Sequence, residues 1–466
     1  MSDRRERIRD TAKYLKNVRP IDPEEIYEYV DGQPHPGVVR TTLRELAPEL
    51  GLREREDGAF VPVEDGPMTV DFDGVEAFPE RYARRLEDLL VERFGPGWPD
   101  GTSGDRLRER LVDLKEGYLH QRDIEYDELT ALCYAVYHLP DYYAVAQYVL
   151  AEMAAEGVLP NRLRVLDIGA GVGGPALGLA DLVPETAVVD YHAVEPSANA
   201  DVLASMLEST PDNVHATVHR ERAQDHDPET TFDLIFFGNV LNELSDPAAV
   251  VRELGSSLAD DGSIVAVEPA DRNTAIGLRS VERELTDEYT VYAPTCRLWP
   301  GKEPTSECWS FDKKPDLDVP AFQQRLADGA GDRFEDGAFV NVDIQYAVSV
   351  LRPDDRQRID YTPDRGTFAA LGEAESFVTD RVDLVAIKLS HDLSDGGNPL
   401  FLIGDGSEGT DAFAVLTHDS SLTTDLARAD YGDLLVFENV LVLWNDDEGA
   451  YNLVVDDEAV VDNAGR

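Results

Sequence analysis

The residue types best suited to holding a ligand lie close together at residues 167–173, which read Asp-Ile-Gly-Ala-Gly-Val-Gly. An apolar run, residues 164–168, leads into them, and residues 175–182 have the composition of a helix. Glycines at alternate positions let the backbone turn tightly and come close to a ligand. A turn of this kind between a strand and a helix N-terminus suits a polar ligand. The stretch therefore predicts a ligand site at a strand–turn–helix junction.

A second feature lies downstream of this turn. Glu195 ends another apolar run, residues 190–194. It stands about 20–25 positions past the loop, where an acidic side chain can accept hydrogen bonds from both hydroxyls of a ribose. The spacing D-x-G-x-G-x-G is typical of methyltransferases that bind S-adenosylmethionine, whereas dinucleotide-binding folds keep G-x-G-x-x-G. We therefore expect this cofactor; the alternative is that Glu195 only caps a helix and Asp167 only tightens a turn.

The residues expected around the cofactor follow from the strand ends. The predicted cofactor-binding residues are Asp167, Gly169, Ala170, Gly171, Gly173, Glu195, Gln224, Asp225 and Asn239. Asp167 would organise the loop, and Gln224 and Asp225 would border the adenine. Asn239 and Asn242 follow the buried run 231–239 and would lie nearest the transferred methyl, so they are the predicted catalytic residues.

The acceptor side has no recognisable catalytic group. Methyltransferases acting on base amino groups usually have an Asn/Asp-Pro-Pro-aromatic signature after the fourth strand, but residues 238–242 read Gly-Asn-Val-Leu-Asn. The catalytic cysteine used on cytosine C5 is also missing from this region. If methyl is transferred, the reaction is an in-line displacement in which positioning supplies most of the acceleration. Binding of the cofactor without turnover is the alternative.

Alternating strands and helices after residue 158 predict a doubly wound, parallel α/β sheet with its ligand above the strand carboxyl ends. The predicted fold is a Rossmann-like class I S-adenosylmethionine methyltransferase core with an N-terminal winged-helix and helical region and a C-terminal β-barrel of the OB-fold type. The predicted parts are a winged-helix-like domain (1–65), a helical region (66–157), the methyltransferase domain with a cysteine-containing insert (158–352), a linker (353–379) and an OB-fold-like domain (380–466).

The two terminal predictions rest on the order of elements. Asp22-Pro23 opens a helix, a second helix starts after Pro36, and residues 52–63 read as a hairpin turning at Asp57-Gly58. Near the other end, β-rich runs separated by turn residues resemble an OB-fold; they span 382–389, 400–404, 412–416, 434–443 and 450–455. Such folds bind single-stranded nucleic acid through aromatic side chains. The candidates are Phe401, Phe413, Phe437, Trp444 and Tyr451.

Charge and composition indicate where the protein works. The chain has 466 residues and a formal net charge of −51, with 93 Asp and Glu against 42 Lys and Arg. Such a chain would repel itself at ordinary salt, so we expect the protein of an extreme halophile, in which molar salt screens charge within a few ångströms. Its 3 cysteines are too few for a disulfide framework. The sequence contains no recognisable signal peptide or membrane-length apolar run, so we expect a cytoplasmic protein.

Several blocks taken together resemble one protein family. They are residues 139–145 (Leu-Pro-Asp-Tyr-Tyr-Ala-Val), the loop 166–174, residues 240–244, Glu268-Pro269 and the segments around Cys296 and Cys308. In this order they resemble the methyltransferase-like small-ribosomal-subunit family, known from mitochondrial ribosome assembly, with bacterial and archaeal relatives. The resemblance implies a haloarchaeal-type member with an added OB-fold. It would act on or assemble the small ribosomal subunit, with rRNA or a ribosomal protein as the methyl acceptor.

The cysteine-containing insert departs from that family. Its members hold an iron–sulfur cluster with four cysteines, whereas Cys296 and Cys308 match only part of that ligand set. We therefore expect neither a cluster nor another metal there. The insert also places the cations Arg297, Lys302, Lys313 and Lys314 among Trp299, Trp309 and Phe311. Cations beside aromatic rings favour contact with single-stranded RNA, and an ordinary solvated loop is the alternative.

Two other functions stay open. The chain could be a non-catalytic RNA-binding or ribosome-assembly scaffold, in which the winged helix and the OB-fold do the work. It could also be a small-molecule methyltransferase, with residues 239–244 lining a compact pocket. No membrane partner is expected.

Overall fold

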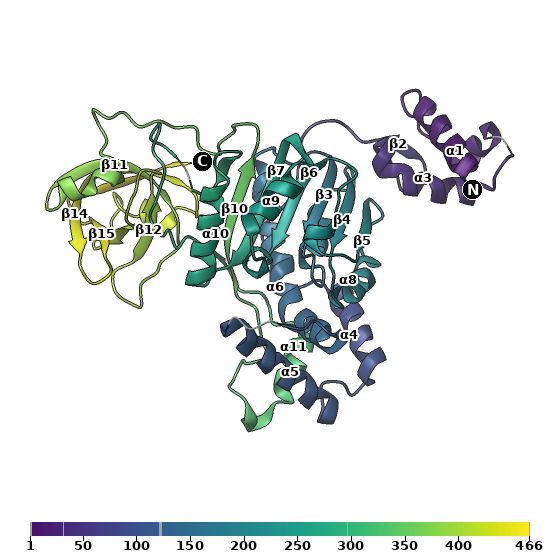
Figure 1. Ribbon diagram of the computed structural model, residues 1–466, viewed down its shortest axis with the longest axis horizontal. Coiled ribbons are helices and arrows are strands. Elements are labelled where there is room, and N and C mark those ends of the chain that lie inside the picture. Colours follow the sequence, from purple (N-terminus) through teal and green to yellow (C-terminus); the bar gives the residue numbers. More distant parts are fainter. Residues whose placement is uncertain (1, 31, 121–123, 296, 466) are drawn as a thin grey trace. The chain divides into compact units, whose positions relative to one another are not determined.

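The computed structural model describes residues 2–30, 32–120, 124–295 and 297–465 (Figure 1). The chain forms two compact units. The first comprises residues 1–236, 257–259 and 315–344, and the second comprises residues 237–256, 260–314 and 345–466. In the described part of the chain, no helix combines the length and the apolar character needed to cross a membrane.

The N-terminal part of the first unit is a small bundle of helices followed by a hairpin. Its elements are α1 (Ser2–Leu15), α2 (Pro23–Ile26), η1 (Tyr27–Tyr29), α3 (Pro36–Leu50), β1 (Leu52–Glu54) and β2 (Phe60–Pro62). The expected helix starts are present, because Asp22 accepts a hydrogen bond from the Glu24 amide ahead of Pro23. Residues of α1 and α3 share a hydrophobic core that includes Ile8, Leu43 and Leu46.

The arginines of α3 are engaged by acids within the same unit. Both Arg40 and Arg44 form ion pairs with Glu54, and Arg44 also pairs with Asp212. The positive residues of α1 are similarly placed, since Arg9 and Lys13 both reach Glu49 of α3. The cations of this region therefore contribute to holding the small domain together.

The helical region contains α4 (Glu80–Phe94), α5 (Gly101–Leu119) and α6 (Glu128–Ala155). The central sheet follows, with strands β3 (Arg162–Ile168), β4 (Val188–Val194), β5 (Val214–His219), β6 (Phe232–Gly238), β7 (Leu258–Pro269), β8 (Thr290–Ala293), β9 (Asp312–Lys314) and β10 (Ile344–Arg352). Its helices are α7 (Gly174–Leu182), α8 (Asn199–Leu207), α9 (Pro247–Gly255), α10 (Arg272–Glu284) and α11 (Ala321–Asp328), with short turns η2 (Ala223–Asp225), η3 (Leu241–Glu243) and η4 (Gly331–Arg333).

The strand order β5-β4-β3-β6-β7-β10-β8 gives the Rossmann-like α/β core that was predicted. β3 pairs with β4, and β4 with β5, in parallel. The prediction of a parallel sheet is wrong at the other end, because β10 runs antiparallel to both β7 and β8. Sequence reading missed β5, β8, β9 and β10, so it had no means of finding this reversal.

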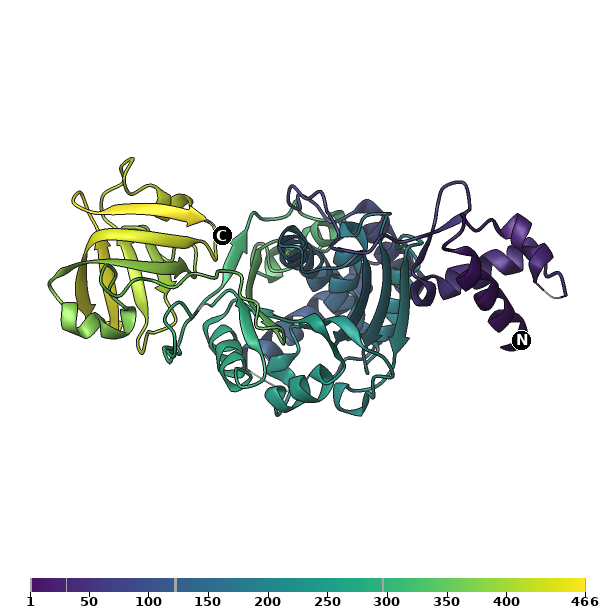
Figure 2. The ribbon, with the colours of Figure 1, turned by 90° about the horizontal axis from the view of Figure 1, so that it is seen from above.

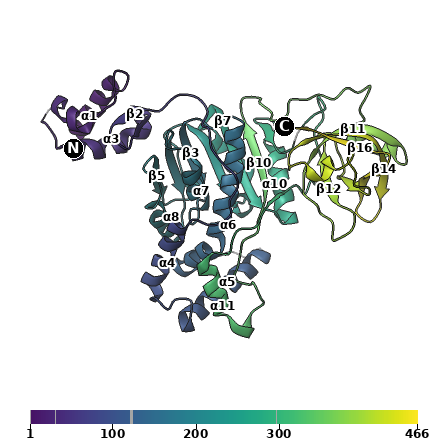
Figure 3. The ribbon, with the colours of Figure 1, turned by 180° about the vertical axis from the view of Figure 1, so that it is seen from behind.

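α6 and α7 lie side by side against β3 in the first unit (Figure 3), and glycines allow their close approach. A Cβ on Gly174 would lie 2.4 Å from Cβ of Tyr142. A Cβ on Gly178 would lie 2.6 Å from the carbonyl oxygen of Tyr143. Because real Cβ atoms do not approach backbone this closely, α7 can contact α6 only if both positions stay glycine.

The C-terminal domain is a closed barrel (yellow and light green in Figure 2), which confirms the OB-fold prediction. Its strands are β11 (Arg381–Lys388), β12 (Leu400–Gly404), β13 (Ala412–Leu416), β14 (Leu434–Asn445) and β15 (Ala450–Val455), with α12 (Asp425–Arg428) between β13 and β14 and an unpredicted strand β16 (Val460–Gly465). β14 also pairs with β11, which closes the barrel, and β13 pairs with β15 in parallel. This is the pairing expected of an OB-fold.

The insert of the second unit packs against this barrel. Leu298, Trp299 and Cys308 share a buried cluster with Val385, Ile387 and Leu402 of the barrel strands. Nε1 of Trp299 donates a 2.7 Å hydrogen bond to the buried carboxylate of Asp405, which also accepts from the Leu371 amide. Leu371 belongs to η5 (Leu371–Phe377) and packs into the barrel core, so this part of the predicted linker is structured.

The close contact of α6 and α7 gives a first prediction. Gly178→Ala will lower the free energy of unfolding by about 1–3 kcal/mol, because overpacking outweighs the roughly 1 kcal/mol by which alanine favours a helix. The matched control is Gly277→Ala in α10, where a Cβ would meet nothing within 4 Å and the change will be neutral or stabilising. Thermal unfolding in multimolar KCl measures both, and equal shifts for the two variants would contradict the packing argument.

Candidate cofactor and acceptor sites

The glycine loop adopts the backbone conformation that its sequence predicts. Gly169, Gly171 and Gly173 have φ of 68°, 55° and 100°, which disfavours residues with a side chain. The amides of Gly169 and Ala170 both donate to the carbonyl of Val194, at 2.9 and 3.1 Å. β3 is therefore joined to the end of β4 through the loop, and α7 begins directly after Gly173.

Asp167 lies fully buried beneath this loop. The hydroxyl of Tyr191 donates a 2.6 Å hydrogen bond to Oδ2, while Oδ1 is buried without a hydrogen-bond partner. Burial raises the pKa of Asp167 to about 7; the Tyr191 hydrogen bond opposes this rise and the charge of Glu195 adds to it. A buried acceptor atom without a partner suits a site that a polar ligand completes.

Glu195 lies at the end of β4 and binds the loop directly. Its Oε2 accepts a 2.9 Å hydrogen bond from the Gly171 amide, and its Oε1 accepts from the amide and hydroxyl of Ser197. The carboxylate is 5% exposed and has lone pairs beyond those used here. The unpartnered Oδ1 of Asp167 and the glycine loop held by Glu195 therefore fit the methyl donor S-adenosylmethionine. Gln224 and Asp225 also belong to this unit and are exposed on η2.

Asn239 and Asn242 belong to the second unit, directly after β6. Asn239 has φ of 55°, its amide donates to Val267, and it is half-buried. Asn242 is exposed on η3. Their roles near a methyl group stay predictions.

Glu268 organises the segment that carries Asn242, and sequence reading assigned it no role. Its Oε1 accepts a 2.8 Å hydrogen bond from the Leu241 amide, and its Oε2 is buried without a partner. Burial raises the pKa of Glu268 to about 8, against the effect of the backbone amides around it. The sequence signal that could have pointed to a role for Glu268 is its place in the Glu268-Pro269 block of the family resemblance.

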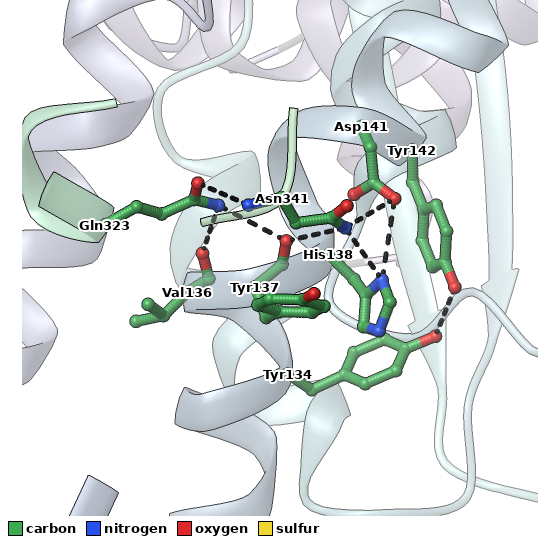
Figure 4. Close-up of polar contacts among 8 residues, drawn as sticks. All are labelled: Tyr134, Val136, Tyr137, His138, Asp141, Tyr142, Gln323 and Asn341. Carbon is green, nitrogen blue, oxygen red and sulfur yellow. Dashed lines mark hydrogen bonds and ion pairs between the residues drawn. The ribbon is translucent and has the colours of Figure 1, made fainter. Parts of the chain in front are cut away.

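A cluster of polar and aromatic side chains on α6, drawn in Figure 4, adjoins the glycine loop. Sequence reading assigned no role to His138 and named Asp141 and Tyr142 only as part of the block 139–145. Cε1 of Tyr134 lies 3.8 Å from where a Cβ on Gly171 would stand. The ring of His138 stacks on Tyr142 at 5.1 Å, and its Nδ1 lies 3.5 Å from Oδ2 of Asp141. Asp141 is buried, and burial raises the pKa of its carboxyl. A half-buried imidazole with an oriented carboxylate is suited to proton transfer.

Pro140 explains why two distant side chains reach this helix. A proline has no N–H, so the carbonyl of Val136 loses its helical partner. Nε2 of Gln323 replaces that donor at 2.9 Å (Figure 4). Nδ2 of Asn341 donates to Asp141 at 3.0 Å and to the Tyr137 carbonyl at 3.2 Å. This segment of α6, next to His138, is therefore held by side chains from residues 321–341.

The described cysteines have buried thiols. Cys308 is 4% exposed, its amide donates to Asp411, and burial raises the pKa of its thiol. Burial also raises the pKa of Cys133, to about 12. Thiols held protonated in this way are poor metal ligands. Cys296, the other predicted partial match to the family's ligands, lies outside the described residues.

The stacking surface predicted for the insert is not formed by all its aromatic residues. Trp299 and Phe311 are buried, at 2% and 6% exposure. Trp309 is half-buried, and its Nε1 donates to the carbonyl of Ala270. Among the barrel candidates, Phe401 and Phe437 belong to the core, whereas Trp444 is 42% exposed and packs edge-on against Tyr451 at 4.9 Å.

A cavity in the first unit lies at the end of the strands opposite to the glycine loop. Arg162, Arg164, Val188 and Asp233 line it, and all stand at the amino ends of their strands. Ligands of open α/β sheets bind at the carboxyl ends. This cavity is therefore not the predicted cofactor site.

Three regions of the chain match known families. Residues 138–317 match the family described as "Methyltransferase domain". Residues 5–56 and 372–464 match the N-terminal and C-terminal domains of a "Domain of unknown function (DUF8157)". The match to a methyltransferase domain thus lies between the matches to the two DUF8157 domains.

The chain is also similar to individual proteins. It is 32% identical over 123 residues to a malonyl-[acyl-carrier protein] O-methyltransferase of Geobacter sulfurreducens; the match covers 25% of this chain and 42% of that protein. A solved S-adenosylmethionine-dependent methyltransferase of Aquifex aeolicus is 20% identical; the match covers 31% of this chain and 80% of that chain, with a TM-score of 0.26. One from Clostridium acetobutylicum is 13% identical, covers 34% and 56%, and has a TM-score of 0.23. The chain spans less than half of the curated relative.

The raised pKa of Asp167 predicts a pH dependence of stability. Its value of about 7 lies above the ordinary value of about 4, so the folded protein binds this proton more tightly than the unfolded chain. The resulting stability is complete below pH ~4 and is lost as the pH rises through about 7. Asp167→Asn will therefore lose less stability than wild type between these values. Unfolding midpoints measured across this range test it, and parallel curves for the two proteins would contradict the assignment.

The missing N–H of Pro140 predicts what happens when the Gln323 side chain that replaces it as donor is removed. Gln323→Leu leaves the Val136 carbonyl buried without a partner and will destabilise the protein by about 1–3 kcal/mol. The neighbouring Gln324 is exposed, and its side chain donates to Asp328; it provides the control variant Gln324→Leu. Chemical denaturation compares the two, and a control as destabilised as Gln323→Leu would refute the role of the hydrogen bond.

Proposed function

We propose that this protein is an S-adenosylmethionine-dependent methyltransferase that acts on the small ribosomal subunit, with rRNA or a ribosomal protein as acceptor. The observation that carries the enzymatic part is the glycine loop above a buried Asp167, with Glu195 bonded to the Gly171 amide. The match of residues 138–317 to a methyltransferase domain supports it. The ribosomal part rests on the resemblance of the sequence blocks, including residues 139–145.

The cofactor, when bound, supplies an electrophilic methyl group. The glycine loop would admit the methionine part, and Glu195 would turn one or both oxygens to the ribose. Asp167 and its bond to Tyr191 keep the loop in place from below. Gln224 and Asp225 stay the predicted border of the adenine, and Asn239 and Asn242 the predicted neighbours of the methyl.

His138 is the side chain of the cluster best suited to receive the acceptor's proton. A nitrogen or oxygen acceptor would lose a proton on receiving the methyl group that the bound cofactor supplies, and the imidazole of His138 would take up that proton. Asp141 lies 3.5 Å from Nδ1 of His138 and orients the ring, while Asn341 fixes Asp141. The rings of Tyr134 and Tyr142 pack against His138, and Tyr134 adjoins Gly171 of the glycine loop. His138 therefore lies beside the loop.

The barrel would supply RNA contact by stacking. The exposed Trp444 with Tyr451 offers a platform of the kind on which OB-folds stack bases. In molar salt, counterion release contributes little, so stacking would have to provide the affinity. We include in this proposal that the protein works in a high-salt cytosol.

Two alternatives compete with this proposal. A ribosome-assembly scaffold that binds the cofactor without turnover would use the same modules. A small-molecule methyltransferase is favoured by the similarity to the malonyl-[acyl-carrier protein] enzyme, over 123 residues.

The deciding experiment incubates the protein with methyl-labelled S-adenosylmethionine and small-subunit particles from a strain lacking this gene, in multimolar KCl. We expect label in rRNA or a ribosomal protein with wild type and none with Asp167→Ala. His138→Gln should bind the cofactor normally but transfer methyl about 100-fold more slowly, the usual contribution of a positioned base.

Other outcomes separate the alternatives. Particles that bind the protein but stay unlabelled, with cofactor binding confirmed by calorimetry, would favour the scaffold. Absence of particle binding would refute the ribosomal part, and label on an acyl-carrier substrate would then identify a small-molecule enzyme.

A further inference from the structure

A group of side chains of the types that bind metal ions lies at the end of β5, apart from the residues assigned to the cofactor. His219 is the last residue of β5, Glu221 follows it, and His226 directly follows η2. One ligand atom from each of the three lies within 4.8 Å of the others. Only 9 histidines occur in the chain, so this grouping uses a scarce residue type.

His219 is held from behind by a chain of polar contacts. Its Nε2 lies 3.1 Å from Nδ1 of His192, and the two rings stack at 5.3 Å with an angle of 10°. Nε2 of His192 in turn lies 3.3 Å from Oδ1 of Asp190. A histidine that binds a metal normally uses its other ring nitrogen in such a hydrogen bond, which fixes the ring. With Nε2 engaged, Nδ1 is the nitrogen through which His219 would bind an ion.

His226 and Glu221 complete the donor set. Nδ1 of His226 lies 2.7 Å from Oε1 of Glu221. The His226 residue is 8% exposed, and its Nε2 is buried without a hydrogen-bond partner. An ion can be bound by only one nitrogen of each ring. Bound through Nδ1 of His226 and a carboxylate oxygen of Glu221, it would replace their hydrogen bond by coordination and join both side chains to His219.

The chemistry of these ligands selects a class of ion. Two imidazoles and a carboxylate suit Zn²⁺ and related first-row transition metals, which bind such atoms at about 2.0–2.2 Å. A tetrahedral ion at that distance requires its ligand atoms to be about 3.3 Å apart. The widest separations in the group, up to 4.8 Å, would therefore shorten and the 2.7 Å contact between His226 and Glu221 would lengthen, both by side-chain movement. We propose that His219, Glu221 and His226 bind one divalent transition-metal ion, with zinc the expected species.

The position of the ligands gives the ion a consequence for the cofactor. Gln224 and Asp225 lie on η2, between Glu221 and His226 in the chain. An ion that joins these two residues closes the segment into a short loop and reduces its freedom before the cofactor binds. This part rests on the proposed function, in which η2 borders the adenine. Zinc will then raise the affinity for S-adenosylmethionine by about 10-fold, through preorganisation.

Direct metal binding tests the site without reference to methyl transfer. The full chain, stripped with a chelator and dialysed against ZnSO₄ in multimolar KCl, should retain one zinc per chain by elemental analysis and show tetrahedral d–d absorption with Co²⁺. Glu221→Gln should weaken zinc binding at least about 100-fold. Glu221 is partly exposed, with 40% of its side chain accessible, so the variant should fold. His215→Gln, on the same strand but outside the group, is the matched control and should bind zinc as wild type does.

The results separate the two parts of the inference. Substoichiometric zinc in wild type, or equal zinc binding by wild type and Glu221→Gln, would overturn the site. Stoichiometric zinc that leaves the calorimetric affinity for S-adenosylmethionine unchanged would overturn the coupling to η2. Absence of methyl transfer would count against the proposed function alone, because zinc retention is measured without the cofactor.

Discussion

The contact between α6 and α7 is the constraint on which the central domain depends. Gly174 and Gly178 let α7 approach the backbone of α6 more closely than any residue with a Cβ would permit. Because α7 starts at the end of the glycine loop, this contact also fixes where the loop lies. The same turn of α6 carries Tyr142 and His138, so one packing requirement brings the cofactor loop and the polar cluster together. Pro140 breaks the helical hydrogen bonding at that level, and Gln323 supplies the missing donor.

Much of the fold could be predicted because local sequence determined it. The loop 167–173 requires positive φ at its glycines, and the barrel runs 400–404, 412–416 and 450–455 match their strands residue for residue. What could not be predicted depended on distant partners. β10 runs antiparallel to its neighbour β7, which lies about 80 residues earlier in the chain, and no local pattern reveals such a pairing.

The candidate sites divide in the same way. Asp167 and Glu195 stand in a motif, so spacing identified them. His138 lies in a helix of apolar and aromatic residues, and its meaning depends on Asn341, two hundred residues away. His219 and His226 are ordinary residues in sequence, and their contacts with His192 and Glu221 in the folded chain show that they belong to a polar cluster. Trp299 was predicted to stack on RNA because it lies among cations in the sequence, but neighbouring charges do not show whether a side chain is buried. In the structure its indole is buried and donates to Asp405 of the barrel.

The shared core of insert and barrel bears on how such a protein can evolve. The family match for the C-terminal domain begins at residue 372, yet Leu298, Trp299 and Cys308 fill part of the hydrophobic cluster beneath its strands. A barrel transferred to another chain without this segment would expose Val385 and Leu402 and leave Asp405 without its indole partner. The two segments are therefore expected to be inherited together and to change together, so that the true evolutionary module is discontinuous in sequence.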